Sequence, residues 1–183
     1  MFVMSGFFES INPINGKFIE NLLPRGTKKN VKVGDLAPDF SLPDGNGNSV
    51  TLSSFRGKRV LLVFTRIYTD KIICPLCYPH LSSLKKDFSK FQELDTEVIV
   101  VNTTSAEMTR EIVASSAFPF TMLSDEQWKV FELYGLGAAA GAPLPGQFIV
   151  GREGKILFVY TCDRFPNHPS NEEMFALLKQ IAK

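Results

Sequence analysis

The chain has 183 residues, of which 44% are hydrophobic and 21% are charged, as in one globular domain with a buried core. Its formal net charge of +1 gives no electrostatic reason to expect a nucleic acid or an anionic membrane as a partner. No apolar run reaches the roughly 18 residues of a transmembrane helix.

Residues 1–30 are predicted to be an N-terminal extension that precedes one domain at residues 31–183. The apolar residues of the extension are spaced as on one face of a helix that Pro13 and Gly16 interrupt, and its end has the composition of a linker. It is interpreted as a segment that packs on the domain or is partly disordered, with docking of a partner or a second subunit as the alternative. The extension also lacks the basic leader and apolar block of a secretory signal.

The domain begins with a predicted β-hairpin whose two arms flank a polar turn at residues 43–48. The second arm, residues 49–52, alternates between polar and apolar side chains, which is typical of a short strand. A helical turn at residues 52–58 then leads into an apolar strand at residues 59–64, predicted to be buried.

Cys74 and Cys77 form a C-x-x-C motif between this strand and a helix predicted over residues 75–94. A strand, a C-x-x-C and a helix in that order indicate a dithiol redox site. Cys74 is expected at the helix N-terminus, where free N–H groups and the macrodipole stabilise a thiolate. Such a position lowers a cysteine pKa from about 8.5 to roughly 3.5–7.5. Cys77, one turn later, is close enough to form a disulfide with Cys74.

The middle of the chain alternates between strands and helices. A β-branched run predicts a strand at residues 96–101, and Thr104 with Glu107 predicts a capping box for the helix that follows. A short strand comes next at residues 118–123. Residues 124–126 are then expected to cap another helix, which ends at Gly135.

The end of the chain is predicted to be a loop, a hairpin and a helix. The loop is the small, glycine-rich segment 137–146, and the hairpin strands are residues 147–150 and 155–160. Ser170 with Glu173 predicts the capping box of the last helix. Helices between strands imply right-handed βαβ units, so the fold class is α/β. Phe64, Trp128 and Phe148 are interpreted as core residues.

Four segments of the domain resemble the AhpC/TSA (peroxiredoxin-like) redoxins of the thioredoxin-fold superfamily. They are residues 33–42, 52–64, 118–135 and 148–156. The resemblance implies a thioredoxin-like fold, with a mixed central sheet flanked by helices and an N-terminal β-hairpin. It also implies a thiol-dependent oxidoreductase with an antioxidant role and no cofactor.

In this reading a Cys74/Cys77 dithiol–disulfide cycle reduces peroxides or disulfides. A cellular dithiol donor, such as a thioredoxin-type protein, restores the dithiol. Three cysteines, an odd number, are not a structural disulfide framework. The predicted compartment is therefore the reducing cytoplasm.

The loop before the cysteines departs from the Pro-x-x-x-Thr-x-x-Cys pattern of typical peroxiredoxins. If Cys74 takes the cysteine place, Lys71 stands at the threonine and Ile67 at the proline. If Cys77 takes it, Cys74 stands at the threonine. Thr69 could substitute for the missing threonine in a shifted loop.

Pro145 is a second departure, because it stands where peroxiredoxins carry an arginine before the last hairpin. A proline there resembles the cis-proline that packs against the C-x-x-C of thioredoxins. The bond between Leu144 and Pro145 is therefore expected to be cis. Pro145, Pro75 and Thr69 are predicted to shape the substrate groove. Both departures favour thioredoxin-style dithiol chemistry.

Three other residues are possible auxiliaries. Cys162 is interpreted as a small residue packed at a strand end, on the same sheet edge as the C-x-x-C, with a second resolving thiol as the alternative. His80 is interpreted as a solvent-facing helix residue, with assistance in proton transfer as the alternative. Arg66 either stabilises a thiolate or peroxide or is a solvated loop charge.

Two alternative functions stay open beside the main hypothesis. One is a protein disulfide reductase without peroxidase activity, which Pro145 and the missing threonine and arginine favour. The other is a non-enzymatic binding module on a redoxin scaffold, which holds a metal or docks through residues 1–30. No metal site is predicted, because the two further ligands that a structural zinc needs are not present at matching spacing.

Overall fold

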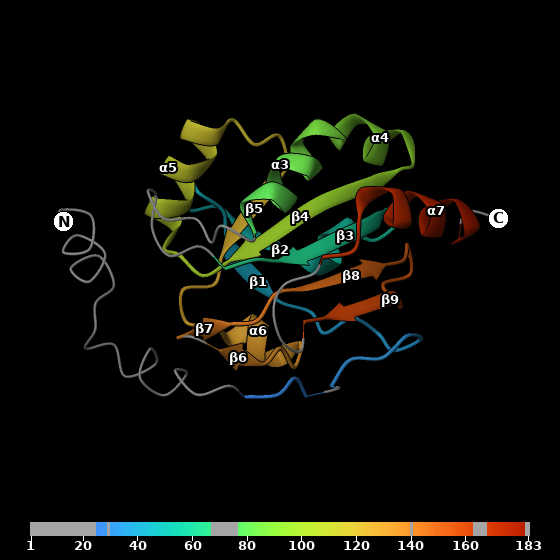
Figure 1. Cartoon of the computed structure of the whole chain (residues 1–183), viewed down its shortest axis with the longest axis horizontal. Coiled ribbons are helices and arrows are strands. Elements are labelled where there is room, and N and C mark those ends of the chain that lie inside the picture. The colour runs from blue at the N-terminus through green and yellow to red at the C-terminus, as the bar shows by residue number, and fades with distance from the viewer. Residues whose placement is uncertain (1–24, 29, 67–76, 140, 163–167, 182–183) are drawn as a thin grey trace.

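The computed structural model describes residues 25–28, 30–66, 77–139, 141–162 and 168–181 (Figure 1). The strands in this part of the chain are β1 (Ser41–Pro43), β2 (Ser49–Thr51), β3 (Arg59–Phe64), β4 (Thr96–Asn102), β5 (Thr121–Ser124), β6 (Ala138–Ala139), β7 (Ala142–Pro143), β8 (Gly146–Val150) and β9 (Ile156–Thr161). The α-helices are α3 (Tyr78–Lys86), α4 (Phe88–Glu93), α5 (Ala106–Ser116), α6 (Lys129–Leu133) and α7 (Asn171–Ile181). None of these helices has the length and apolar character needed to cross a membrane.

A five-stranded mixed sheet organises the molecule, in the order β5-β4-β3-β8-β9. Strands β3, β4 and β5 are parallel neighbours, and β8 and β9 add the antiparallel part. The predicted α/β class and mixed central sheet are confirmed, as is the N-terminal hairpin formed by β1 and β2. Every residue of β3 is buried, because helices and loops cover both faces of this central strand.

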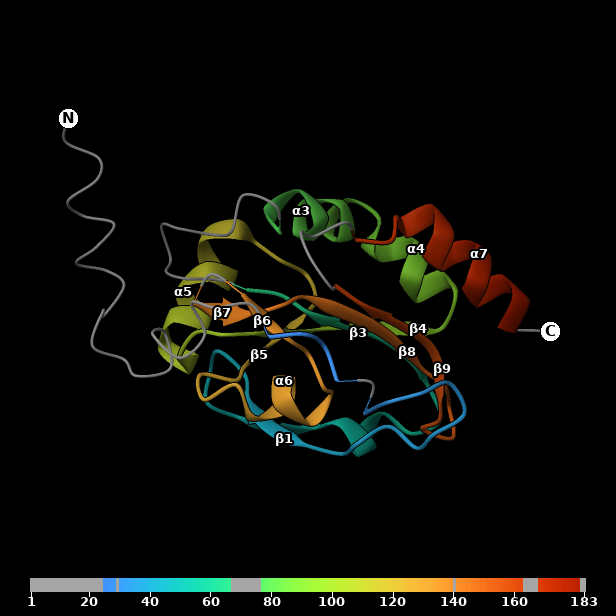
Figure 2. The same ribbon diagram turned by 60° about the horizontal axis from the view of Figure 1, so that its bottom comes forward.

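The helices divide between the two faces of the sheet (Figures 1 and 2). Helices α3, α4, α5 and α7 cover one face, while α6 and the β1–β2 hairpin lie on the other. Side chains of β3 alternate between two hydrophobic clusters, one on each face of the sheet. Leu61 and Val63 belong to the first cluster, on the face that α3, α4, α5 and α7 cover. Leu62 and Phe64 belong to the second cluster, on the face where α6 lies.

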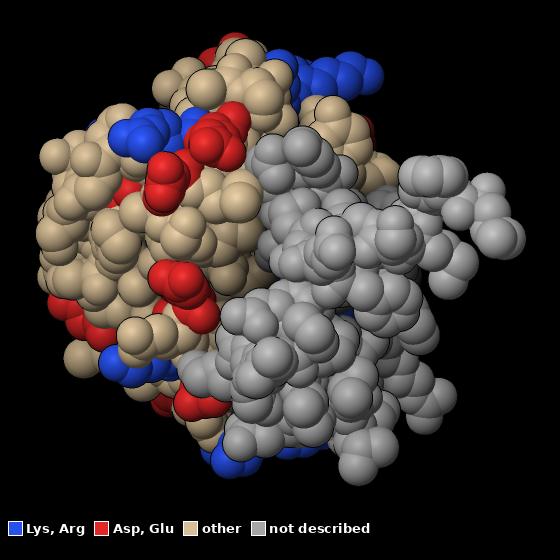
Figure 3. Space-filling model, turned by 90° about the vertical axis from the view of Figure 1, so that its left-hand side faces the viewer, with Lys and Arg blue, Asp and Glu red and all other residues tan. Residues whose placement is uncertain are grey.

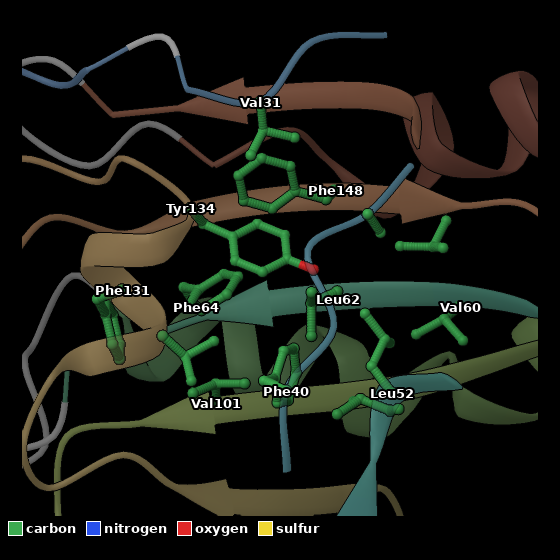
Figure 4. Packing of buried hydrophobic residues seen from close by; sticks show 14 of the residues in the cluster. Val31, Phe40, Leu52, Val60, Leu62, Phe64, Val101, Phe131, Tyr134 and Phe148 are labelled. Carbon is green, nitrogen blue, oxygen red and sulfur yellow. The ribbon is translucent and has the colours of Figure 1, made fainter. Parts of the chain in front are cut away.

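Phe64 is at the centre of the second cluster (Figure 4). Its ring centroid lies 5.0 Å from those of Phe131 and Tyr134 and 5.7 Å from that of Phe148. The Tyr134 hydroxyl donates to the carbonyl of Pro38 at 2.9 Å, and burial raises its pKa. Phe64 and Phe148 are confirmed as core residues, and Trp128 is partly buried against the same cluster.

The helix predicted over residues 75–94 is interrupted near its middle. Helix α3 ends at Lys86, and α4 begins at Phe88. Asp87 between them has φ −102° and ψ 13°. Its carboxylate accepts hydrogen bonds from Lys90 and from Asn171 of α7. The Asp87 side chain thus links the break between the two helices to α4 and to α7.

The predicted helix caps are partly confirmed. Glu173 and Ser170 exchange hydrogen bonds at the start of α7 as a capping box. The Asp125 carboxylate accepts from three backbone N–H groups at the start of α6. The capping residue of α5 is Ser105, which accepts from the N–H of Met108, so the predicted Thr104–Glu107 box is wrong.

Residues 25–28 lie against the domain. Arg25 pairs with Ala138 of β6, and the N–H of Lys28 donates to the carbonyl of Gly135 at 2.7 Å. A Cβ atom at Gly137 would come within 2.3 Å of the Arg25 carbonyl oxygen. The segment 137–146, predicted to be wholly a loop, contains the paired two-residue strands β6 and β7. The pairing of Arg25 with Ala138 holds β6 in an extended conformation.

Candidate functional site at the end of strand β3

Strand β3 ends at one edge of the sheet, where its last residue is paired across β8 with β9. Phe64 at the end of β3 is opposite Gly146 of β8, which is opposite Thr161 of β9. Cys162 follows Thr161 and so lies at the edge where β3 ends; that it shares this edge with the C-x-x-C stays a prediction. The loop that carries Cys74 leaves from this edge, but Cys74, Pro75 and Thr69 lie outside the described residues.

Cys77 is at the N-terminus of α3 and is fully buried. It is the N-cap residue, and its carbonyl accepts the N–H of Leu81 at 3.1 Å. Its expected place within the first turns of the helix is therefore wrong. Pro79 explains the shift, because a proline, which lacks an N–H, is well tolerated in the first turn. Cys77 thus stands at the end of α3 where the first backbone N–H groups have no partner within the helix.

Arg66 is buried rather than solvated, with 7% of its surface exposed. One guanidinium nitrogen, Nη2, donates to the carbonyl of Ala139 in β6 at 3.0 Å. This bond places a fixed cation two residues after β3, at the base of the loop that leads to the cysteines. The interpretation of Arg66 as a solvated charge is wrong, because the β6–β7 hairpin covers it.

Pro145 and Cys162 hold the same edge together. The carbonyl of Pro145 accepts the N–H of Cys162 at 3.1 Å, and the Cys162 carbonyl accepts from the hydroxyl of Thr27 at 3.3 Å. No peptide bond in the described part of the chain is cis. The cis prediction for Leu144–Pro145 is therefore wrong: a trans bond lets Pro145 continue the hydrogen-bonding pattern of β8 with β9. Cys162 is buried at 2% exposure.

His80 is buried, so the prediction that it faces solvent is wrong. It lies on the inner side of α3, and the Nε2 atoms of His80 and Gln147 are 2.6 Å apart. An amide nitrogen can only donate, so His80 accepts through Nε2 and carries its proton on Nδ1. The His168 ring stacks on the His80 ring, with centroids 4.3 Å apart and planes at 4°.

Both imidazoles are held neutral by burial. Desolvation, assisted by His168, lowers the pKa of His80 to about 3, and desolvation lowers that of His168 to about 4. Neither ring therefore stabilises a thiolate as a cation at neutral pH. Among the described residues, no group of three or more His, Cys, Asp or Glu side chains could hold a metal.

Gln147 and His168 were missed as site residues from the sequence. Gln147 stands in a strand whose other residues are apolar or glycine, and a lone polar residue in a buried strand is the signal that could have found it. His168 belongs to no regular pattern. Only the tertiary structure brings it to His80, 88 positions earlier in the chain.

These features define a redoxin of the thioredoxin fold, in which a buried cysteine begins the helix beside the end of a central strand. The profile of the AhpC/TSA family matches residues 33–159. The chain belongs to the AhpC/TSA family. The resemblance of the four sequence segments to this family is thereby confirmed.

Individual relatives agree with the family assignment. The chain is 30% identical to "Peroxiredoxin Bcp" of Escherichia coli (strain K12) over 145 residues, which cover 75% of this chain and 90% of the relative. The crystal structure of "Peroxidoxin BcpB" from Mycobacterium tuberculosis has the same fold, with a TM-score of 0.70, 22% identity, and coverage of 82% and 98%.

The crystal structure of a "putative Thiol:disulfide interchange protein DsbE" from Chlorobium tepidum is also similar. Its TM-score is 0.64 at 25% identity, with coverage of 83% of this chain and 98% of that chain. The family and its peroxiredoxin relatives identify the chain as a thiol-dependent oxidoreductase. They do not favour the non-enzymatic binding module.

Proposed function

We propose that the enzyme reduces peroxides with Cys74 as the attacking thiolate and Cys77 as the resolving thiol. The observation that carries this assignment is the position of Cys77, which is buried at the N-terminus of α3. One turn later in this helix, His80 contacts Gln147, which is opposite Val63 near the end of β3. The C-x-x-C spacing keeps Cys74 within disulfide reach of Cys77. Arg66 supplies a fixed positive charge at the base of the intervening loop.

The reaction consists of two displacements. In the first, the Cys74 thiolate attacks the terminal peroxide oxygen: an S–O bond forms, the O–O bond breaks, and the departing alkoxide or hydroxide takes up a proton. In the second, the sulfur of Cys77 attacks the sulfenic acid of Cys74: the S–S bond forms, the S–O bond breaks, and hydroxide leaves as water with the proton of the Cys77 thiol.

A dithiol protein of the thioredoxin type is proposed as the reductant, because thiol–disulfide exchange restores both cysteines and oxidises the donor. The proposed compartment is the cytoplasm, where such donors keep dithiols reduced. Pro145 and, outside the described residues, Pro75 and Thr69 are proposed to line the substrate groove.

The test is peroxide turnover, coupled to a thioredoxin-type donor, in single-cysteine variants. Cys74→Ser should abolish turnover. Cys77→Ser should allow one oxidation of Cys74 but no intramolecular disulfide, which mass mapping after alkylation detects. Cys162→Ala is the matched control and should leave turnover unchanged, because Cys162 is proposed to be a packed strand-end residue. Turnover that survives Cys74→Ser would refute the assignment.

Protein disulfide reduction is the second candidate, and the similarity to the interchange protein favours it. The same Cys74 thiolate would then attack a disulfide sulfur in place of a peroxide oxygen. Rates measured side by side with hydrogen peroxide and with insulin disulfides separate the two. Faster insulin reduction, with negligible peroxide consumption, would reverse the order of the candidates.

A further inference from the structure

A polar contact joins the helix that carries Cys77 to the middle of the sheet. Gln147 lies in β8, opposite Val63 of β3 on one side and Tyr160 of β9 on the other. Its side chain is fully buried and donates to His80 of α3 at 2.6 Å. We call this contact the His80–Gln147 joint.

The joint lies within otherwise apolar packing. Leu81 and Leu84 of α3 are fully buried in the same cluster as Val63 and Ile149 of the sheet. Apolar burial is non-directional and permits small shifts of a helix along a sheet. A short hydrogen bond in a buried site requires a defined distance and angle, and a buried polar group without its partner is costly. The joint therefore fixes where α3 lies over β8.

Cys77 is three positions before His80, at the beginning of the same helix. Residues three apart are neighbours on one helix face. A displacement of His80 is consequently passed on to Cys77 with little loss. The ring of His168 stacks on one face of the His80 imidazole and restricts the rotation of that imidazole.

We propose that His80 and Gln147 are positioning residues for the resolving thiol, holding the N-terminus of α3 so that Cys77 meets the sulfur of oxidised Cys74. This inference rests on the proposed function and assigns to both residues a role in its second step. Both side chains are buried, and the role assigned to them requires no contact with the peroxide or the donor.

A second polar contact on the same helix supplies a matched control. Asn171 of α7 donates to the carbonyl and hydroxyl of Ser83 at 3.0 and 2.9 Å and to Asp87 at 2.9 Å. Like Gln147, Asn171 is a buried amide residue, with 2% of its surface exposed. It holds the far end of α3, away from Cys77. Asn171→Leu should therefore lower stability without affecting the position of Cys77.

The experiment follows a single turnover with hydrogen peroxide and quenches it by alkylation at successive times. Mass mapping then gives the rate at which Cys74 sulfenic acid becomes the Cys74–Cys77 disulfide. Gln147→Leu and His80→Leu should slow that step about tenfold, since misplacement by about 1 Å costs up to about a hundredfold. Asn171→Leu should leave this rate close to that of the unmodified protein, because the contacts of Asn171 are with Ser83 and Asp87, at the end of α3 away from Cys77.

The double variant His80→Leu/Gln147→Leu separates positioning from stability. Replacing both partners with apolar side chains removes the unpaired buried group, so the urea midpoint should recover relative to the single variants. The disulfide step should remain slow, because no directional contact is restored. A double variant that recovers stability and rate together would overturn the inference, and so would normal rates in both single variants.

If a single variant fails to fold, the double variant decides the question by the same rate. A disulfide between cysteines other than Cys74 and Cys77 in the unmodified protein would refute the proposed function and this inference together. Normal Cys74–Cys77 pairing with unchanged variant rates would refute the inference alone.

Discussion

Acidification from pH 7 to pH 5 should destabilise the protein through its two buried histidines. In the folded chain the pKa of His80 is lowered to about 3 and that of His168 to about 4, against 6.5 for an ordinary histidine. Between pH 6.5 and pH 4 the unfolded chain therefore binds more protons than the folded chain. The stabilising effect of the neutral rings is fully present above pH 6.5 and is lost as the pH falls.

The size of the loss follows from the width of this window. Each histidine changes the free energy of unfolding by about 1.4 kcal/mol per pH unit over the window, which gives about 2 kcal/mol between pH 7 and pH 5. The two together should cost about 4 kcal/mol, a large part of the roughly 5–15 kcal/mol that stabilises a typical domain. The carboxylates with lowered pKa values, Asp44, Asp87 and Glu173, have ordinary values of 3.8, 3.8 and 4.5. Their contribution is lost mainly below pH 5, outside the range from pH 7 to pH 5.

Urea unfolding at pH 7, 6 and 5 measures the effect, provided that the slope m stays constant. The midpoint should fall steadily, and the variant His80→Leu/Gln147→Leu should retain about half of the decrease, through His168. The histidine ring signals in NMR spectra should not titrate between pH 7 and pH 5. A midpoint that is independent of pH over this range, or rings that titrate near pH 6.5, would refute the reasoning.

Two further predictions concern packing around the site. Phe64→Ala should lower the free energy of unfolding by about 3–5 kcal/mol, because removal of a fully buried ring with three aromatic neighbours leaves a cavity. Urea unfolding measures this change. The control Val33→Ala, at a side chain 64% exposed, should change the free energy of unfolding by less than about 0.5 kcal/mol. Gly137→Ala should displace residues 25–28 and speed tryptic cleavage there, because its Cβ would collide with the Arg25 carbonyl. Gly26→Ala, where the added Cβ meets nothing within 4 Å, should not, and equal cleavage of the two variants would contradict this contact.

The architecture could be predicted from the sequence because its signals are local. The apolar run of β3 and the β-branched run of β4 each appear in a few consecutive residues, and the helical pattern between them corresponds to α3 and α4. The capping box of Ser170 and Glu173 is likewise contained in one turn. On its surface the chain carries both signs of charge interspersed over the described part of the face in Figure 3, in keeping with the net charge of +1.

The surroundings of the cysteines could not be predicted in the same way, because they depend on contacts between distant segments. The sequence pattern alone predicts a solvent-facing His80, although in the structure this residue is buried and contacts Gln147, 67 positions later. Arg66 was similarly ambiguous until the β6–β7 hairpin placed a carbonyl against it, 73 positions away. The charge or exposure of a side chain next to a motif is thus decided by residues that no local window contains.

Polar residues are distributed unevenly along the sheet and lie toward the edge at which we propose that the chemistry takes place. On the face that α3 covers, the inward positions of β3 read Leu61 and Val63 and then, just past the strand end, Thr65; those of β8 read Gln147 and then Ile149. Because β8 is antiparallel to β3, both polar residues fall at the edge where β3 ends. Buried polar groups cost free energy unless they are bonded. An apolar core followed by polar groups at this edge gives the fold its stability from one part of the sheet and leaves the directional His80–Gln147 contact in the part that we propose to position the thiol.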